Sequence, residues 1–204
     1  MTPAAEVSTR GVLLIGLGWL LIATAFGAAG VMRSLPPAAT PLVLLGLTAV
    51  VLAVAWRRAG FQAWLSTLDE RWLVALHLTR FVGFYFLYLY GNGQLPYAFA
   101  VPAGWGDIAV ASLAALLLVA GPPRDARRRA AYIMWNVLGL VDILFVVATA
   151  GRLVLADPPS MAALRGLPLS LLPTFLVPLL IASHVVLGVR LLRHDAARHG
   201  PLRR

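Results

Sequence analysis

Residues 130–150 of the chain read AAYIMWNVLGLVDILFVVATA, the clearest indication of the fold class in the sequence. It contains one charged residue, Asp142, and one side-chain amide, Asn136, in an otherwise largely apolar run. An α-helix needs about 20 predominantly apolar residues to cross the hydrocarbon core of a bilayer. The stretch therefore predicts a membrane-spanning helix.

Five further stretches are apolar enough to span a bilayer, or nearly so. They cover residues 11–31, 41–56, 72–90, 106–120 and 168–192. The last contains Pro173 and Pro178, which either kink the helix or mark its first turn. We therefore predict an all-α polytopic transmembrane helix bundle of about six spans, which forms a single membrane domain over residues 1–204.

The composition fits this class and excludes several others. Hydrophobic residues make up 60% of the chain and charged residues 12%, and the mean hydropathy is +0.84. Soluble domains carry about 25% charged residues, so the chain is poorly suited to water. Cysteine is absent, which excludes disulfides, thiolate catalysis and Cys-ligated metals. The net charge of +9 does not indicate nucleic-acid binding, because the arginines lie in short segments between apolar runs.

The distribution of arginine predicts the orientation. With the N-terminus inside, 13 of the 17 arginines fall on the cytoplasmic side, three fall outside and Arg80 lies within a span. Because cytoplasmic loops are enriched in arginine, we predict an N-in, C-in, multi-pass protein of a bacterial cytoplasmic membrane. The first apolar run is alternatively a signal peptide cleaved near Ala23-Thr24-Ala25, which would leave five spans in the same orientation.

Two connections have unusual sequences. In residues 59–71, Phe61, Trp64, Leu65 and Leu68 share one helical face, which predicts a helix lying in the cytoplasmic interface or an extension of the third span. Residues 91–104 read GNGQLPYAFAVPAG, which is uncharged and broken by glycines and prolines. This segment is either a re-entrant outer loop or an apolar loop resting at the outer interface.

The sharpest structural expectation is an ion pair between Arg80 and Asp142. Ionisable residues inside a membrane segment are costly and need a partner or a role. Arg80 lies about 12 Å along its span from the cytoplasmic end, and Asp142 lies about 18 Å along its own. Such a pair either fixes helix packing alone or forms a substrate or proton site.

Two histidines form a second candidate site. His77 and His184 are expected at similar depth on different helices, where they either hydrogen-bond across helices or ligate a haem b iron. Gly83 and Gly188 would leave room for the flat haem ring. No third ligand falls at that depth, so we expect no other metal.

Asp107 follows two glycines at the predicted start of the fourth span, residues 106–120. A carboxylate there caps the free N–H groups of the first turn. The alternative is an outward-facing site shared with Gln94 and Asn92.

No catalytic signature such as G-x-S-x-G or H-E-x-x-H occurs, so catalytic residues cannot be assigned. The favoured hypothesis is small-molecule or ion binding or transport at a polar site between the third, fifth and sixth spans. The alternatives are a haem or redox protein using His77 and His184, and a non-catalytic accessory subunit. The candidate binding residues are Arg80, Asp142, Asn136, His77, His184, Asp107 and Gln94.

The expected partners follow from the same residues. The arginine-rich loop at 124–129 and the C-terminal tail are topology signals that can also bind anionic lipids. A homo-oligomer or a membrane partner subunit is compatible with the sequence, and nucleic acid is not expected.

Overall fold

The computed structural model describes residues 7–198 of the chain, with side chains to Arg193. Within these residues every regular element is helical and no strand occurs. Six helices are long and apolar enough to cross a membrane, which confirms the predicted fold class at this level.

The first two spans are α1 (Thr9–Ala28) and α3 (Ala39–Arg57), joined through the short α2 (Val31–Ser34). The third span, Glu70–Gly91, combines α5 (Glu70–Ala75), η1 (Leu76–Val82), which is a 3-10 helix, and α6 (Gly83–Gly91). The fourth is α7 (Tyr97–Ala120) and the fifth is α8 (Ala126–Ala156). The short 3-10 helix η2 (Ala162–Arg165) follows. The sixth span, Leu172–Arg193, begins with a π-helical turn, η3 (Leu172–Leu176), which continues into α9 (Val177–Arg198).

The fourth span corrects the expectation for residues 91–104. The prediction of a non-helical loop through Gly104 was wrong, because α7 begins at Tyr97 and continues through Pro102. Only a tight turn separates α6 from α7, and Gly93 takes a left-handed conformation there with φ of 68°. Membrane helices tolerate an interior proline because neighbouring groups satisfy the freed carbonyl. The segment is the α6–α7 turn followed by the first two turns of α7.

The connection after α3 contains the predicted extra helix. It is α4 (Ala59–Thr67), which has no buried residue and ends before α5 begins. The indole of Trp64 donates a hydrogen bond to the Thr9 hydroxyl at 3.1 Å, which holds α4 against the start of α1. Asp69 then caps α5, and the hydrogen bonds from Arg71 lower the pKa of Asp69.

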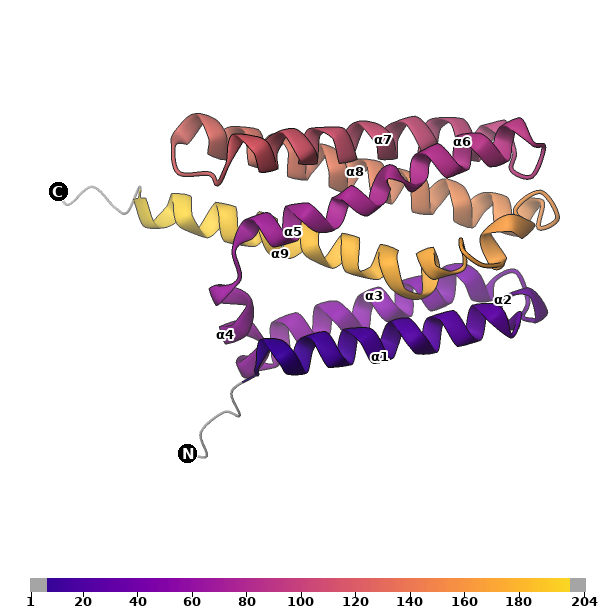
Figure 1. Cartoon of the computed structure of the whole chain (residues 1–204), viewed down its shortest axis with the longest axis horizontal. Coiled ribbons are helices and arrows are strands. Elements are labelled where there is room, and N and C mark those ends of the chain that lie inside the picture. Colours follow the sequence, from indigo (N-terminus) through magenta and orange to yellow (C-terminus); the bar gives the residue numbers. More distant parts are fainter. Residues whose placement is uncertain (1–6, 199–204) are drawn as a thin grey trace.

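The helices form two groups. α6, α7 and α8 pack together, and α9 lies between this group and the pair formed by α1 and α3 (Figure 1). One end of the bundle contains the start of α1, the connections on either side of α4, the α7–α8 loop and the C-terminal half of α9 (Figure 1). The other connections lie at the opposite end. Most of the arginines described therefore gather at one end of the bundle.

The surface of the bundle is apolar, unlike that of a soluble protein. Large apolar side chains face outward, and Val119 is 88% exposed. A small set of polar groups is buried in the largely apolar interior, and among them Arg80 is 1% exposed and two histidines are fully buried. An apolar surface is favourable when lipid surrounds the helices, and buried ionisable groups then need partners.

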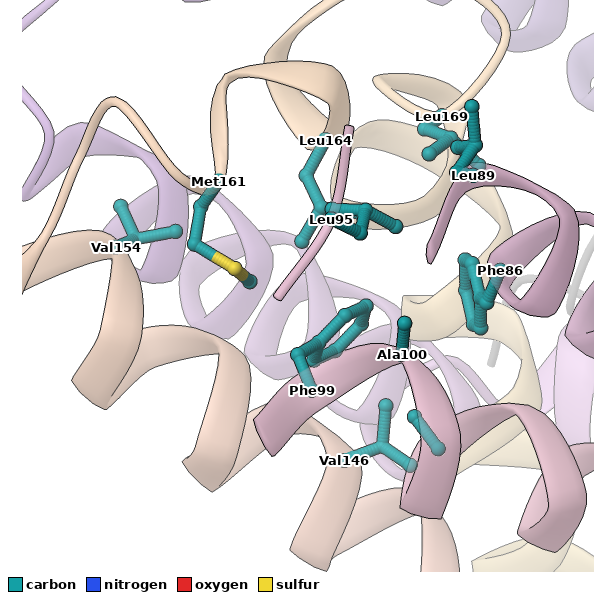
Figure 2. Close-up of a cluster of buried hydrophobic side chains, with 11 residues drawn as sticks. Phe86, Leu89, Leu95, Phe99, Ala100, Val146, Val154, Met161, Leu164 and Leu169 are labelled. Carbon is teal, nitrogen blue, oxygen red and sulfur yellow. The ribbon is translucent and has the colours of Figure 1, made fainter. Parts of the chain in front are cut away.

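An apolar cluster closes the bundle at the end that includes the α6–α7 turn. Phe86, Phe99 and Val146 come from α6, α7 and α8 and meet beneath Met161 and Leu164, which lie in and beside η2 (Figure 2). Phe86 and Phe99 pack in a tilted arrangement, with an interplanar angle of 59° and a centroid distance of 5.2 Å. This cluster separates the polar residues deeper in the bundle from that end of the molecule.

Candidate functional site

The centre of the candidate site is the guanidinium of Arg80. Its Nε donates to Asp107 Oδ1 at 2.6 Å, its Nη1 donates to the Gly139 carbonyl at 3.0 Å, and its Nη2 donates to Asp142 Oδ2. The predicted ion pair between Arg80 and Asp142 is thus confirmed. We call Arg80, Asp107 and Asp142 the triad.

The 3-10 geometry of η1 explains why Arg80 points inward together with His77. Residues three apart are eclipsed in a 3-10 helix, so both side chains project to the same side. A 3-10 stretch of seven residues is unusually long, and such stretches in the middle of a helix often mark a hinge or a strained functional segment.

Asp107 is the member of the triad whose role the sequence reasoning missed. We expected it to cap the fourth span, but it lies ten residues inside α7, is 3% exposed and binds Arg80. The reason is the earlier start of α7. Asp107 falls on the buried face of α7 with small residues at helical spacing, namely Ala100, Ala103, Ala111 and Ala114.

Gln94 does not join the triad. It lies exposed in the α6–α7 turn, and Tyr97 at the start of α7 is already about 15 Å along the helix axis from Asp107. Asn92 donates to the Tyr88 carbonyl at 2.7 Å within the same turn. The outward-facing site of Asp107, Gln94 and Asn92 is therefore not formed.

Glycines let the spans approach closely enough to bring the triad together. A methyl group added at Gly83 would meet the backbone of α7 at Gly104 and the Asp107 Cβ at 3.1 Å. A methyl group at Gly106 would overlap the carboxylate of Asp142. The third, fourth and fifth spans thus converge because side chains are missing at these positions.

The triad carries unequal charges. One guanidinium faces two carboxylates, so the three groups sum to −1 when both carboxylates are ionised. Asp107 is almost fully buried, whereas the side chain of Asp142 is 20% exposed. A buried surplus charge in a membrane is costly unless a proton or another cation neutralises it.

A second polar layer lies beside the triad. His77 Nε2 is 2.9 Å from Ser183 Oγ, and His184 Nδ1 is 2.9 Å from Asn136 Oδ1. Ser183 Oγ donates to the Leu180 carbonyl, and Asn136 Nδ2 donates to the His184 carbonyl at 3.0 Å. Ser183 Oγ and Asn136 Oδ1 therefore accept hydrogen bonds from the two histidines.

These contacts assign the tautomers of the two histidines. With Nε2 of His77 and Nδ1 of His184 as donors, each ring keeps one nitrogen with a free lone pair. Those nitrogens, His77 Nδ1 and His184 Nε2, are buried and without a hydrogen-bond partner. The predicted similar depth of the two histidines is confirmed, and the structure adds that their rings are in contact, with centroids 4.1 Å apart.

The arrangement does not fit haem held between His77 and His184. A porphyrin lies between its two axial imidazoles, whereas these two rings are in direct contact with each other. The space beside Gly188 is occupied by the Asn136 amide, and Gly83 packs against α7. Among the side chains described, those of residues 7–193, no three His, Asp or Glu gather closely enough to hold a metal ion.

A cavity of about 70 Å³ adjoins the triad on the side of the apolar cluster. Its walls come from α3, η1, α6, α7, α8, η2, η3 and α9 and are apolar except for Thr40, Arg80 and Asp107. Thr40 is buried, and its hydroxyl oxygen has no hydrogen-bond partner. The π-helical η3 lines the same cavity, and π-turns occur frequently at functional sites.

Other arginines hold connections in place. Arg165 is buried and donates from Nε to the Met32 carbonyl at 2.9 Å, which ties η2 to α2. Arg190 donates to the Leu68 carbonyl at 2.8 Å. Neither contacts Asp107. The tail residues His199, Arg203 and Arg204 lie outside the described residues, as does the side chain of His194.

Comparison with known proteins gives a family and no assigned activity. No curated protein and no solved structure matches the chain. Residues 37–192 match one domain family. The match includes the triad, the polar layer around His77 and His184, and nearly all of five of the six spans. The chain therefore belongs to the family described as domain of unknown function DUF8737.

Proposed function

We propose that the protein binds a small molecule at the triad and in the adjoining cavity, and carries it across the membrane. The observation that supports this most directly is the buried Arg80, which is shared by two carboxylates and lines a cavity together with Asp107 and Thr40. A pair that only fixed helix packing would need one carboxylate and no adjoining space.

The chemistry of the cavity favours a small organic cation. The surplus carboxylate attracts a positive group, and the apolar walls stabilise alkyl groups attached to it. The Thr40 hydroxyl supplies a further hydrogen-bonding group. When no cation is bound, a proton on one carboxylate neutralises the triad. Exchange of the organic cation for a proton would couple transport to the proton gradient.

We also propose that the arginine-rich end of the bundle faces the cytoplasm in a bacterial inner membrane. This orientation makes the chain a multi-pass protein with both ends inside, as the positive-inside rule favours. Arg124, Arg127 and Arg128 are exposed at that end and are suited to bind anionic lipid headgroups.

Three probes of nearly the same shape test the charge selectivity of the site. Tetramethylammonium is a permanent cation, tert-butanol is neutral and pivalate is an anion. Each is titrated into the detergent-purified protein while the melting temperature is followed, because a ligand that binds the native state raises it. We expect tetramethylammonium to stabilise the protein most and pivalate not at all.

Asp107→Asn is the decisive variant. It removes the surplus charge but leaves Arg80 paired with Asp142, so the protein should fold and lose its stabilisation by tetramethylammonium. Arg127→Gln changes an exposed charge at the end of the bundle and is the matched control. Equal responses to all three probes, or an unchanged response in Asp107→Asn, would contradict the proposal and leave the triad as a packing element of a structural subunit.

Uptake of radiolabelled tetramethylammonium into proteoliposomes then separates transport from binding alone. We expect uptake to be driven by a proton gradient with an acidic lumen and an alkaline exterior, because a proton leaves the vesicle as the cation enters. Stabilisation without uptake would reduce the proposal to a binding protein.

A further inference from the structure

A groove between α1 and α3 lies away from the triad. It has a volume of about 860 Å³ and its apolar walls include Ile15, Leu47 and Val51. α1 and α3 make few direct contacts with each other, so side chains of the two helices do not close the space between them. Gly16 lines the groove, and a methyl group added there would meet no atom within 4 Å.

The length of the groove corresponds to one leaflet of a bilayer. Along α3 it extends from Leu47 to Arg57, which is about 15 Å at the rise of an α-helix. The hydrocarbon core is about 30 Å thick, so one leaflet contributes about half of that. Trp19 and Leu179 lie among the lining residues at the deep end.

The charges of the groove lie at its mouth. Arg57 and Arg58 are exposed there, and the lining contains no acidic residue. Among residues 7–193, neither arginine is held in a salt bridge. Arginine binds phosphate through its planar fork of donors, so the mouth is complementary to an anionic headgroup.

We propose that this groove binds one anionic phospholipid, with an acyl chain between α1 and α3 and its phosphate at Arg57 and Arg58. The lipid belongs to the leaflet at the arginine-rich end of the bundle. It fills apolar space that the two helices leave open and anchors α1 to the rest of the molecule. The site is independent of the triad and does not rest on the proposed transport function.

Native mass spectrometry of the full chain tests the proposal. The protein is released from micelles containing equimolar phosphatidylglycerol and phosphatidylcholine, and the bound lipid is identified by mass. We expect one retained phosphatidylglycerol in the wild type. Arg57→Gln combined with Arg58→Gln should lower the preference for phosphatidylglycerol about thirtyfold, the equivalent of about 2 kcal/mol for two arginines.

Two further variants separate the parts of the site. Arg124→Gln combined with Arg127→Gln removes the same charge from an exposed cluster at the same end that attracts headgroups only at the membrane surface. Neither residue lines the groove, so this variant should keep the lipid retained there. A methyl group at Gly16 meets no atom within 4 Å, so Gly16→Phe can place its ring in the open groove. It should fold, match the wild type's melting temperature in lipid-free detergent and retain neither lipid.

Three outcomes would overturn the proposal. The first is equal retention of phosphatidylglycerol by the Arg57/Arg58 variant and the wild type. The second is lipid retention in folded Gly16→Phe. The third is a dimer mass without lipid that Gly16→Phe converts to monomer, which would mean that a second copy of the chain covers the groove.

Discussion

At the scale of single residues, the defining feature is the imbalance of the triad. Arg80 is buried and needs at least one carboxylate, while the second carboxylate, on either Asp107 or Asp142, is in excess. Removing one partner of a buried ion pair leaves an uncompensated charge, which is worse than removing the pair. The three residues should therefore respond very differently to neutralisation.

Arg80→Leu should be the most damaging change. It leaves two carboxylates without a cation, and the loss of a buried partner costs about 3–5 kcal/mol. Asp107→Asn and Asp142→Asn should each be tolerated, because one carboxylate still balances Arg80. The double variant Asp107→Asn/Asp142→Asn should again be destabilised, because Arg80 then has no counter-charge. The free energy of unfolding, measured by titration with a denaturing detergent, tests this order.

The same series contains its own control. Lowering the pH protonates carboxylates, so the free energy of unfolding of Arg80→Leu should itself rise as the pH falls. That of the double asparagine variant, which has no carboxylate left at the triad, should gain nothing from this protonation. Equal losses in all four variants would mean that each side chain acts only through packing.

Gly139 provides a second prediction at this scale. A methyl group added there would lie 2.6 Å from Cε1 of His184 and 3.1 Å from Val110 Cγ1. Gly139→Ala should thus displace His184 from Asn136 and destabilise the protein by about 1–3 kcal/mol. The matched change Gly46→Ala meets no atom within 4 Å and should be neutral or slightly stabilising. The melting temperatures of Gly139→Ala and Gly46→Ala test this prediction. Similar values for the two variants would contradict tight packing of the polar layer around His77 and His184.

At the scale of elements, two spans are interrupted where they face the site. The third span tightens into η1 and the sixth widens into η3. The cause in η3 is clear from the sequence. Pro178 has no N–H, so the Thr174 carbonyl lacks its regular partner four residues on. The indole of Trp19 replaces it by donating to Thr174 O at 2.9 Å.

This contact makes α1 dependent on the π-turn. Trp19→Phe keeps an aromatic ring against Phe175 but removes the donor, which leaves a carbonyl unsatisfied at a cost of about 1–3 kcal/mol. We expect faster amide hydrogen exchange in α1 of this variant and unchanged exchange in α7 and α8. Trp64→Phe, which loses the exposed hydrogen bond to Thr9, is the comparison, and any faster exchange that it causes in α1 should be confined to the first turn. If Trp19→Phe changes the exchange rates of α1 no more than those of the other five spans, then α1 is held by other contacts.

The spans were predictable from the sequence, but the start of α7 was not. The six spans were predicted because apolar length is a local property of the chain. The start of α7 was predicted about nine residues too late, because prolines and glycines in residues 91–104 are typical of loops. A competing signal was present in the small residues Ala100 and Ala103, which share the buried face with Asp107.

At the scale of the whole molecule, the two ends of the bundle differ in charge. Loops at one end carry most of the arginines described, and the apolar cluster of Phe86, Phe99 and Val146 lies toward the other (Figures 1 and 2). The proposed orientation places the arginine-rich end in the cytoplasm.

The absence of cysteine allows a clean test of orientation. Gln94→Cys lies in the exposed α6–α7 turn, and Arg127→Cys lies in the exposed α7–α8 loop. A membrane-impermeant maleimide should label Gln94→Cys in intact cells with the outer membrane opened, and Arg127→Cys only after the inner membrane is lysed. The reverse pattern would invert the orientation.

The sequence by itself determined the class of fold, the number of spans and the two polar partners Arg80 and Asp142, because hydropathy and buried charge are visible residue by residue. It also indicated that His77 and His184 lie at one depth. Only the tertiary structure decided that Asp107 is the second partner of Arg80, that Ser183 and Asn136 hold the histidines, and that Thr40 faces a cavity. These depend on the rotation of each helix about its axis and on the close approach of spans at Gly83 and Gly106. Packing between spans fixes both, and no single segment of the chain encodes them.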